Sequence, residues 1–101
     1  MVKIDDSICI TIKKFSEGLN KQYRIKNIYI YGSYTDGSYD EWSDIDLAVV
    51  LDEKEAPSRE IYSMGKEYDL RFDALGFSKN DFDNSFLPII PEIKKKGIKI
   101  I

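Results

Sequence analysis

Two aspartates spaced by two residues, Asp44 and Asp46, open an apolar run and are the first side chains that suggest chemistry. On an extended strand, residues i and i+2 project from the same face. Their oxygens can therefore converge on a hard divalent cation such as Mg²⁺. Asp73, on the polar face of a later alternating segment, could complete a site for two such ions. Asp73 could instead form a surface ion pair with Arg71 or a neighbouring lysine. Asp69 shares that face and is an alternative third carboxylate, but Asp73 is preferred for its place late in the strand.

A glycine and a serine precede these carboxylates at a fixed distance. Gly32-Ser33 ends a short aromatic and β-branched run, and ten residues separate it from Asp44. Glycine permits unusual dihedral angles and a close backbone approach. The Ser33 hydroxyl and nearby amides can bind phosphate oxygens. The pattern predicts a cradle for a nucleoside triphosphate beside the metal site. Taken singly, Gly32 could merely end a strand, Ser33 could be a helix cap, and the two aspartates could be a solvated strand start.

The periodicity of the sequence predicts the elements that hold these residues. Apolar steps of three or four indicate helices, and alternation indicates strands. The expected order is a helix at 5–22, a strand at 27–31, a loop at 33–43 with room for a helical turn, a strand at 44–51, a helix at 55–67, a strand at 68–75, a loop at 78–84, a helical turn at 92–96 and a small strand at 98–101.

These elements predict an α/β (α+β) fold in one domain, residues 1–101. We expect a small, mixed, twisted sheet with helices mainly on one face and the carboxylates near strand ends on the other. In the strand at 44–51, alternation assigns one face to Ile45, Leu47, Val49 and Leu51, and the opposite face to Asp44, Asp46, Ala48 and Val50.

Composition excludes several classes of function. The 101 residues carry 18 acidic and 15 basic side chains, and a net charge of −3 gives no general attraction for a nucleic-acid backbone. The chain has no histidine, which excludes Ser-His and Cys-His nucleophiles and histidine-ligated zinc. A single cysteine, Cys9, cannot form an internal disulfide. Without a leader or a long apolar run, we expect no membrane insertion and a cytoplasmic protein.

The motifs resemble the nucleotidyltransferase domain of the DNA polymerase beta-like superfamily, and in particular its minimal members, which resemble the antitoxin MntA. Its signature is Gly-Ser, ten intervening residues, then Asp-x-Asp, which Gly32-Ser33 and Asp44-Ile45-Asp46 match without a gap. The resemblance covers most of the chain, since the elements appear in family order. It implies that Asp44 and Asp46 bind Mg²⁺ and nucleotide phosphates, and that Asp73 helps to activate an acceptor hydroxyl.

One position departs from the family pattern. Relatives often carry a basic residue shortly after Gly-Ser, where this chain has Thr35-Asp36-Gly37. A negative charge near phosphates weakens donor binding unless a metal or another cation, such as Lys54, Arg59 or Arg71, compensates.

The loop aromatics and the basic run near the end of the chain receive no role in the predicted site. Tyr34, Tyr39 and Trp42 could stack on a base, but loop aromatics more often pack beneath the loop or meet a partner. The run Lys94-Lys95-Lys96 is interpreted as a solvated helix end.

The resemblance also implies a function. We expect Mg²⁺-dependent transfer of a nucleoside monophosphate, AMP from ATP, to a hydroxyl, with two ions in the site. Larger relatives bind the acceptor with a second domain, so the acceptor here is expected on another protein, a tyrosine of a helical HEPN toxin that this chain neutralises as an antitoxin. Two alternatives stay open: an aminoglycoside-type small-molecule transferase, and a catalytically weak module that binds nucleotide or neutralises a partner. The residues do not by themselves fix the nucleotide, and a homo-oligomer stays open.

Overall fold

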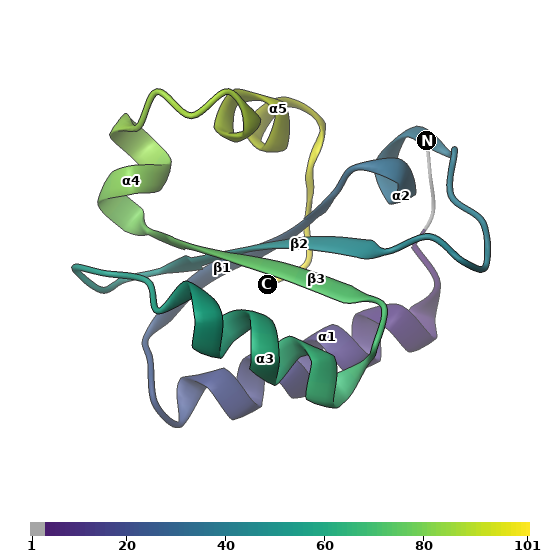
Figure 1. Cartoon of the computed structure of the whole chain (residues 1–101), viewed down its shortest axis with the longest axis horizontal. Helices are drawn as coiled ribbons and strands as arrows, with labels where there is room; N and C mark the ends of the chain where they lie inside the picture. Colours follow the sequence, from purple (N-terminus) through teal and green to yellow (C-terminus); the bar gives the residue numbers. More distant parts are fainter. Residues whose placement is uncertain (1–3) are drawn as a thin grey trace.

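The computed structural model describes residues 4–101, which form a four-stranded sheet and five helices (Figure 1). The prediction of one domain includes residues 1–3, which lie outside the described residues, and it stays a prediction. The elements in chain order are α1 Asp6–Asn20, β1 Ile25–Tyr31, α2 Ser33–Asp36, β2 Ile45–Leu51, α3 Ser58–Tyr68, β3 Phe72–Ser78, α4 Lys79–Asn84, α5 Ile89–Lys96 and β4 Ile98–Lys99.

The sheet is mixed, with strand order β3-β2-β1-β4. β1 pairs antiparallel with β2 and with β4, whereas β2 pairs parallel with β3. The parallel pair requires a crossover connection, which α3 provides. β2 therefore lies in the middle of the sheet with the β1 and β3 strands on either side. This mixed sheet confirms the predicted fold class.

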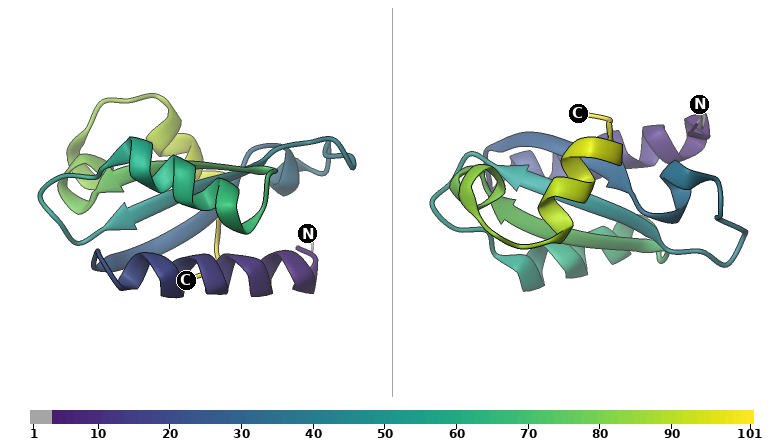
Figure 2. Two further views of the ribbon diagram at one scale, coloured as in Figure 1. Left: turned by 60° about the horizontal axis from the view of Figure 1, so that its bottom comes forward. Right: turned by 90° about the horizontal axis from the view of Figure 1, so that it is seen from above.

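The face of the sheet that packs on α1 and α3 is called the lower face here (Figures 1 and 2). It is apolar throughout, because the alternation of β2 sends Ile45, Leu47, Val49 and Leu51 to this side, as predicted. α1 contributes buried residues at helical spacing, among them Ile12 and Phe15. Asp5 caps α1 by accepting a hydrogen bond from the Ser7 amide at 2.8 Å. The two long helices thus lie on one face, as expected from the sequence.

The opposite, upper face carries a smaller cluster beneath α4 and α5 (Figures 1 and 2). Ala48 and Val50 of β2 contact this cluster, which confirms the second half of the predicted alternation. Phe82 of α4 stacks on Tyr29 of β1, with ring centroids 5.5 Å apart. The two short helices cover only part of the upper face, so the end of the sheet at which β2 begins is left for polar residues.

Two predicted boundaries were wrong. The third strand was expected at 68–75, but α3 continues to Tyr68 and β3 begins at Phe72. The apparent alternation before Phe72 belongs to a turn, in which the Asp69 carboxylate accepts from the amide and guanidinium of Arg71. The segment 78–84, expected as a loop, contains α4, because the Ser78 hydroxyl caps its first turn by accepting from the Asp81 amide at 3.1 Å.

Within residues 4–101 no helix combines the length and apolar character that a membrane span needs.

Candidate active site

Three neighbouring strands bring one tyrosine and two aspartates into a row. Asp46 on β2 is the register partner of Tyr31 on β1 and of Asp73 on β3. Side chains opposite each other on paired strands stand on the same face about 4.5–5.5 Å apart at Cβ. Asp44 lies exposed just before β2. The structure thus brings all three predicted carboxylates to one end of the sheet, next to the point where β1 ends.

The electrostatics of this row are unfavourable in the protein alone. Partial burial, then the negative charges of Asp73 and Asp44, raises the pKa of Asp46 from 3.8 to about 6. Burial, followed by Asp46, Asp73 and Glu92, raises the pKa of the Tyr31 hydroxyl far above its usual range. Burial and neighbouring negative charge both shift these pKa values upward. A bound cation would lower the two pKa values.

The donor set fits a hard divalent cation. Asp44, Asp46 and Asp73 supply carboxylate oxygens, and no histidine competes for a softer metal. In the described part of the chain, no three His, Cys, Asp or Glu residues are arranged to hold a metal ion by themselves. Mg²⁺ does not need three protein ligands, since it keeps several waters and binds one or two carboxylates together with substrate phosphates. The open arrangement therefore fits Mg²⁺ that arrives with a nucleotide.

Gly32 lies directly against this row. Its φ is +75°, a left-handed conformation that glycine adopts without strain. A Cβ atom at this position would overlap the Asp46 Oδ2 atom. The amide and hydroxyl of Thr35 both donate to the Gly32 carbonyl, at 2.9 and 2.8 Å, and close the turn into α2. The backbone between β1 and α2 therefore touches the carboxylate of β2, as the predicted phosphate cradle requires.

Comparison with known proteins identifies the fold family. Residues 12–100 match the profile of the nucleotidyltransferase domain family. The chain belongs to this family. Over 57 residues it is 39% identical to MJ1379 of Methanocaldococcus jannaschii, provisionally named a protein adenylyltransferase, and the alignment covers 56% of this chain and 57% of that relative. It is 28% identical over 98 residues to MJ0141 of the same organism, which carries the same provisional name, with coverages of 88% and 94%.

A solved structure supports the fold. A crystal structure of a toxin-antitoxin with AMP-PNP superposes with a TM-score of 0.68, over 92% of this chain and 72% of that chain. The sequence identity is 19%, so this likeness concerns the fold alone. The chain spans little more than half the length of MJ1379, the first of these relatives.

Asp36, the acidic residue after the Gly32-Ser33 turn of this nucleotidyltransferase domain, is hydrogen-bonded within its own loop. Asp36 Oδ1 accepts hydrogen bonds from the hydroxyl and amide of Ser38, at 2.6 and 2.9 Å. These bonds, and more weakly the positive charge of Lys96, lower the pKa of Asp36. Lys96 ends α5, and it was not among the compensating cations proposed from the sequence. This charge effect depends on the packing of α5 against β1, and sequence spacing does not reveal it.

The structure also separates the two candidates for the third carboxylate. Asp69 Oδ2 lies 2.8 Å from the Arg71 guanidinium, and hydrogen bonds from Arg71 lower the pKa of Asp69. Asp73 instead faces Asp46 across the parallel pair. The nucleotidyltransferase domain thus places Asp73, and not Asp69, in the row, and Arg71 is occupied by Asp69.

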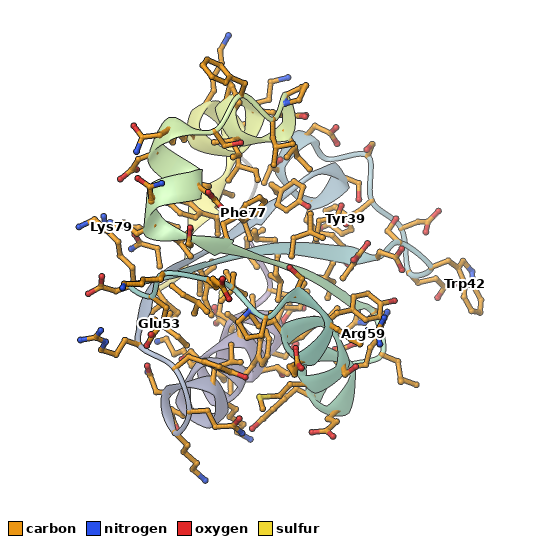
Figure 3. All side chains as sticks on the ribbon, turned by 60° about the vertical axis from the view of Figure 1, so that its left-hand side comes forward. Tyr39, Trp42, Glu53, Arg59, Phe77 and Lys79 are labelled. Atoms are coloured by element: carbon orange, nitrogen blue, oxygen red, sulfur yellow. The ribbon has the colours of Figure 1, made fainter. Side chains whose placement is uncertain are left out.

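The loop aromatics of the domain divide into two groups. Tyr34 is buried and stacks on Tyr39 with ring centroids 4.3 Å apart, while Tyr39 itself stays 43% exposed. Trp42 is 85% exposed and points away from the body of the domain (Figure 3). Neither arrangement places an aromatic ring over the carboxylate row.

Proposed function

We propose that this domain transfers AMP from ATP to a hydroxyl of a partner protein, a tyrosine of a HEPN-type toxin, and so acts as an antitoxin. The observation that carries the proposal is the row of Asp46 and Asp73 facing the Gly32 turn on the open end of the upper face. Two relatives provisionally named protein adenylyltransferases and a toxin-antitoxin of the same fold support this acceptor class.

The proposed reaction is an in-line displacement at phosphorus. The acceptor oxygen forms a bond to the α-phosphorus of ATP, the bond from that phosphorus to the bridging oxygen breaks, and pyrophosphate leaves. The hydroxyl proton passes to Asp73, the predicted base. Asp44, Asp46 and Asp73 would hold two Mg²⁺ ions, which supply charge neutralisation at the phosphates when bound.

The protein groups contribute position and charge. The Gly32-Ser33 backbone and the Ser33 hydroxyl would bind the triphosphate, because the turn leaves them at the end of β1 beside Asp46. Ser33 is partly exposed, and within residues 4–101 its hydroxyl has no hydrogen-bond partner, so it is available to a phosphate oxygen. Holding donor and acceptor in line is the main catalytic device in such a site.

Label transfer from ATP tests this proposal. Purified protein, Mg²⁺ and α-labelled ATP are incubated with the helical partner protein captured from native cells. We expect labelled partner with the wild type, loss of label with Asp44→Ala/Asp46→Ala, and full label with the matched control Asp69→Asn, which removes a carboxylate outside the row. Labelling that survives the double substitution would overturn the site.

A second candidate function rests on Asp36, the acidic residue in the nucleotide loop. Its exposed carboxylate is fully ionised at neutral pH, since its pKa is lowered, and it repels phosphates. If calorimetry shows that the partner binds equally with and without ATP and Mg²⁺, and no acceptor is labelled, the domain is a partner-neutralising module without transfer.

A further inference from the structure

β3 forms an edge of the sheet that is not protected. It pairs with β2 on one side, and among residues 4–101 no strand pairs with its other side. Edge strands expose unpaired N–H and C=O groups and usually carry lysine, proline or a bulge that prevents further pairing. β3 has none of these, and Asp73 is its single charged residue.

A hollow continues from this edge. Its volume is about 480 Å³, and its lining combines four apolar side chains with smaller and polar residues: Leu75, Phe77, Leu87 and Ile89, together with Ser58, Gly76, Asp81 and Ser85. Leu75 is 36% exposed and Leu87 is 50% exposed. The hollow therefore runs along β3 between α3 below and the α4–α5 connection above, which Figure 1 shows on the same side of the sheet as α4.

The edge and the hollow lead directly to the carboxylate row. Residues two apart on a strand share a face, so Leu75 follows Asp73 on the upper face and Phe77 follows Leu75. In a strand added to β3, the residue opposite Asp73 would stand on the same face with its Cβ about 4.5–5.5 Å away. That separation places a serine or threonine hydroxyl beside the Asp73 carboxylate, and the longer tyrosine side chain extends past it over the carboxylate row.

We propose that β3 receives an extended segment of the acceptor protein as an added strand, which presents its hydroxyl side chain to Asp73. This inference rests on the proposed function and names how the acceptor is held. Main-chain hydrogen bonds supply affinity in such complexes, and alternate side chains supply specificity. The acceptor class is thus a locally unfolded or extended segment, and a hydroxyl on a helix face is excluded.

The hollow also defines the chemistry of that segment. The position opposite Leu75 is apolar, because its side chain enters the hollow next to Leu87. The next position on the same face reaches the end of the hollow where Asp81 lies, the one charged residue among those that line it. Charge complementarity selects lysine or arginine there. The preferred segment therefore carries a hydroxyl residue, an apolar residue and a basic residue at alternate positions, with any residue between them. The order runs in one of the two chain directions.

The probe is a synthetic peptide with tyrosine, leucine and lysine at alternate positions and valine between them, made in both chain orders. A matched peptide with proline in place of the valine between tyrosine and leucine lacks one main-chain donor. Hydrogen exchange of the protein amides is measured with each peptide in the presence of AMP-PNP and Mg²⁺, and AMP transfer to the tyrosine is measured in parallel with ATP.

The protein variant is Leu87→Lys, which fills the hollow and neutralises Asp81 from an exposed loop position. The matched control is Ile10→Lys on α1, where an equally exposed apolar side chain lies away from β3. We expect one chain order of the peptide to slow exchange of β3 amides by about tenfold or more. Leu87→Lys should weaken peptide binding by about tenfold, whereas Ile10→Lys, the nucleotide affinity and the exchange of β1 should not change.

Three outcomes would overturn the inference. The first is label transfer to protein or peptide with no protection of β3, which leaves the proposed function intact. The second is equal binding of the proline peptide. The third is protection of β3 that appears without peptide, rises with protein concentration and accompanies a doubled mass in sedimentation, since a second copy then occupies the edge. Protection of β3 without any label transfer would support the docking site and count against the proposed function.

Discussion

The two faces of the sheet follow different rules although the same strands build them. On the lower face every strand position meets α1 or α3 and is apolar, and Phe15, Phe72 and Leu47 have no exposed surface. On the upper face the apolar cluster ends at Ala48, and the next position along β2 is Asp46, beside Tyr31 and Asp73. One strand thus carries packing on one side and repelling charge on the other.

The lower face raises the free energy of unfolding of the domain, whereas the charged end of the upper face lowers it. Burial of apolar side chains on the lower face stabilises the fold. The charge of Asp46 opposes folding, because burial and the negative charges of Asp73 and Asp44 raise its pKa. Substitutions on the two faces should therefore change stability with opposite sign.

The largest effect is expected on the lower face. Phe15→Ala removes a fully buried ring that packs against Phe72 at 5.9 Å and Tyr68 at 5.6 Å between ring centroids. The free energy of unfolding should fall by about 3–5 kcal/mol. Urea denaturation measures it. Nucleotide affinity per folded molecule should stay at the wild-type value, and a selective loss of that affinity would show that the two faces are not separable.

A glycine pair tests the contact between the turn and the row. Gly32→Ala should lower the free energy of unfolding by about 2 kcal/mol or more, since it adds left-handed strain and pushes Asp46 aside. It should also abolish ATP binding, as measured by calorimetry. Gly37→Ala is the control: its φ is +81° but a Cβ there meets open space, so strain of about 1 kcal/mol is expected and ATP should still bind.

Removal of charge from the upper face should stabilise the protein. Asp46 has a pKa of about 6 in the folded chain against 3.8 ordinarily, so folding favours its protonated form. The full shift corresponds to about 3 kcal/mol, and solvent screening reduces this, so Asp46→Asn should gain about 1–2 kcal/mol near pH 7.5.

The pH dependence gives the sign of this effect. The destabilisation by Asp46 is complete above its folded pKa of about 6 and disappears as the pH falls toward 3.8. The difference in melting temperature between the wild type and Asp46→Asn should therefore shrink to zero as the pH falls from about 6 to 3.8. A variant that is less stable than the wild type at neutral pH would contradict the assigned repulsion.

The smallest effect is the response to Mg²⁺. About 10 mM Mg²⁺ should stabilise the wild type by about 1.4 kcal/mol if its dissociation constant is near 1 mM. Asp46→Asn/Asp73→Asn should not respond in differential scanning fluorimetry. Asp69→Asn, which leaves the row intact, should respond like the wild type.

Sequence reasoning predicted the lower face, and it predicted that the carboxylates lie on the opposite face, because periodicity carries that information. The alternation around Ile45 and Asp46 assigned both faces of β2 correctly, and the spacing of Gly32 and Asp44 led to the right end of the sheet. It preferred Asp73 to Asp69 from position alone and kept both open, since the pairing of Asp69 with Arg71 depends on where α3 ends. The approach of Lys96 to Asp36 was not predictable either, because tertiary packing of α5 produces it.

The contact of Gly32 with Asp46 has a consequence for how descendants of this domain can change. Because the carboxylate occupies the space that a Cβ atom would need, position 32 is restricted to glycine for as long as position 46 is aspartate. If Asp46 is replaced first, the steric clash with a side chain at position 32 disappears, and only the left-handed backbone still favours glycine. If Gly32 is replaced first, the new side chain clashes with Asp46 and the protein is damaged. The two positions should therefore drift in a fixed historical order, and a side chain at position 32 would mark a lineage in which the carboxylate had already fallen out of use.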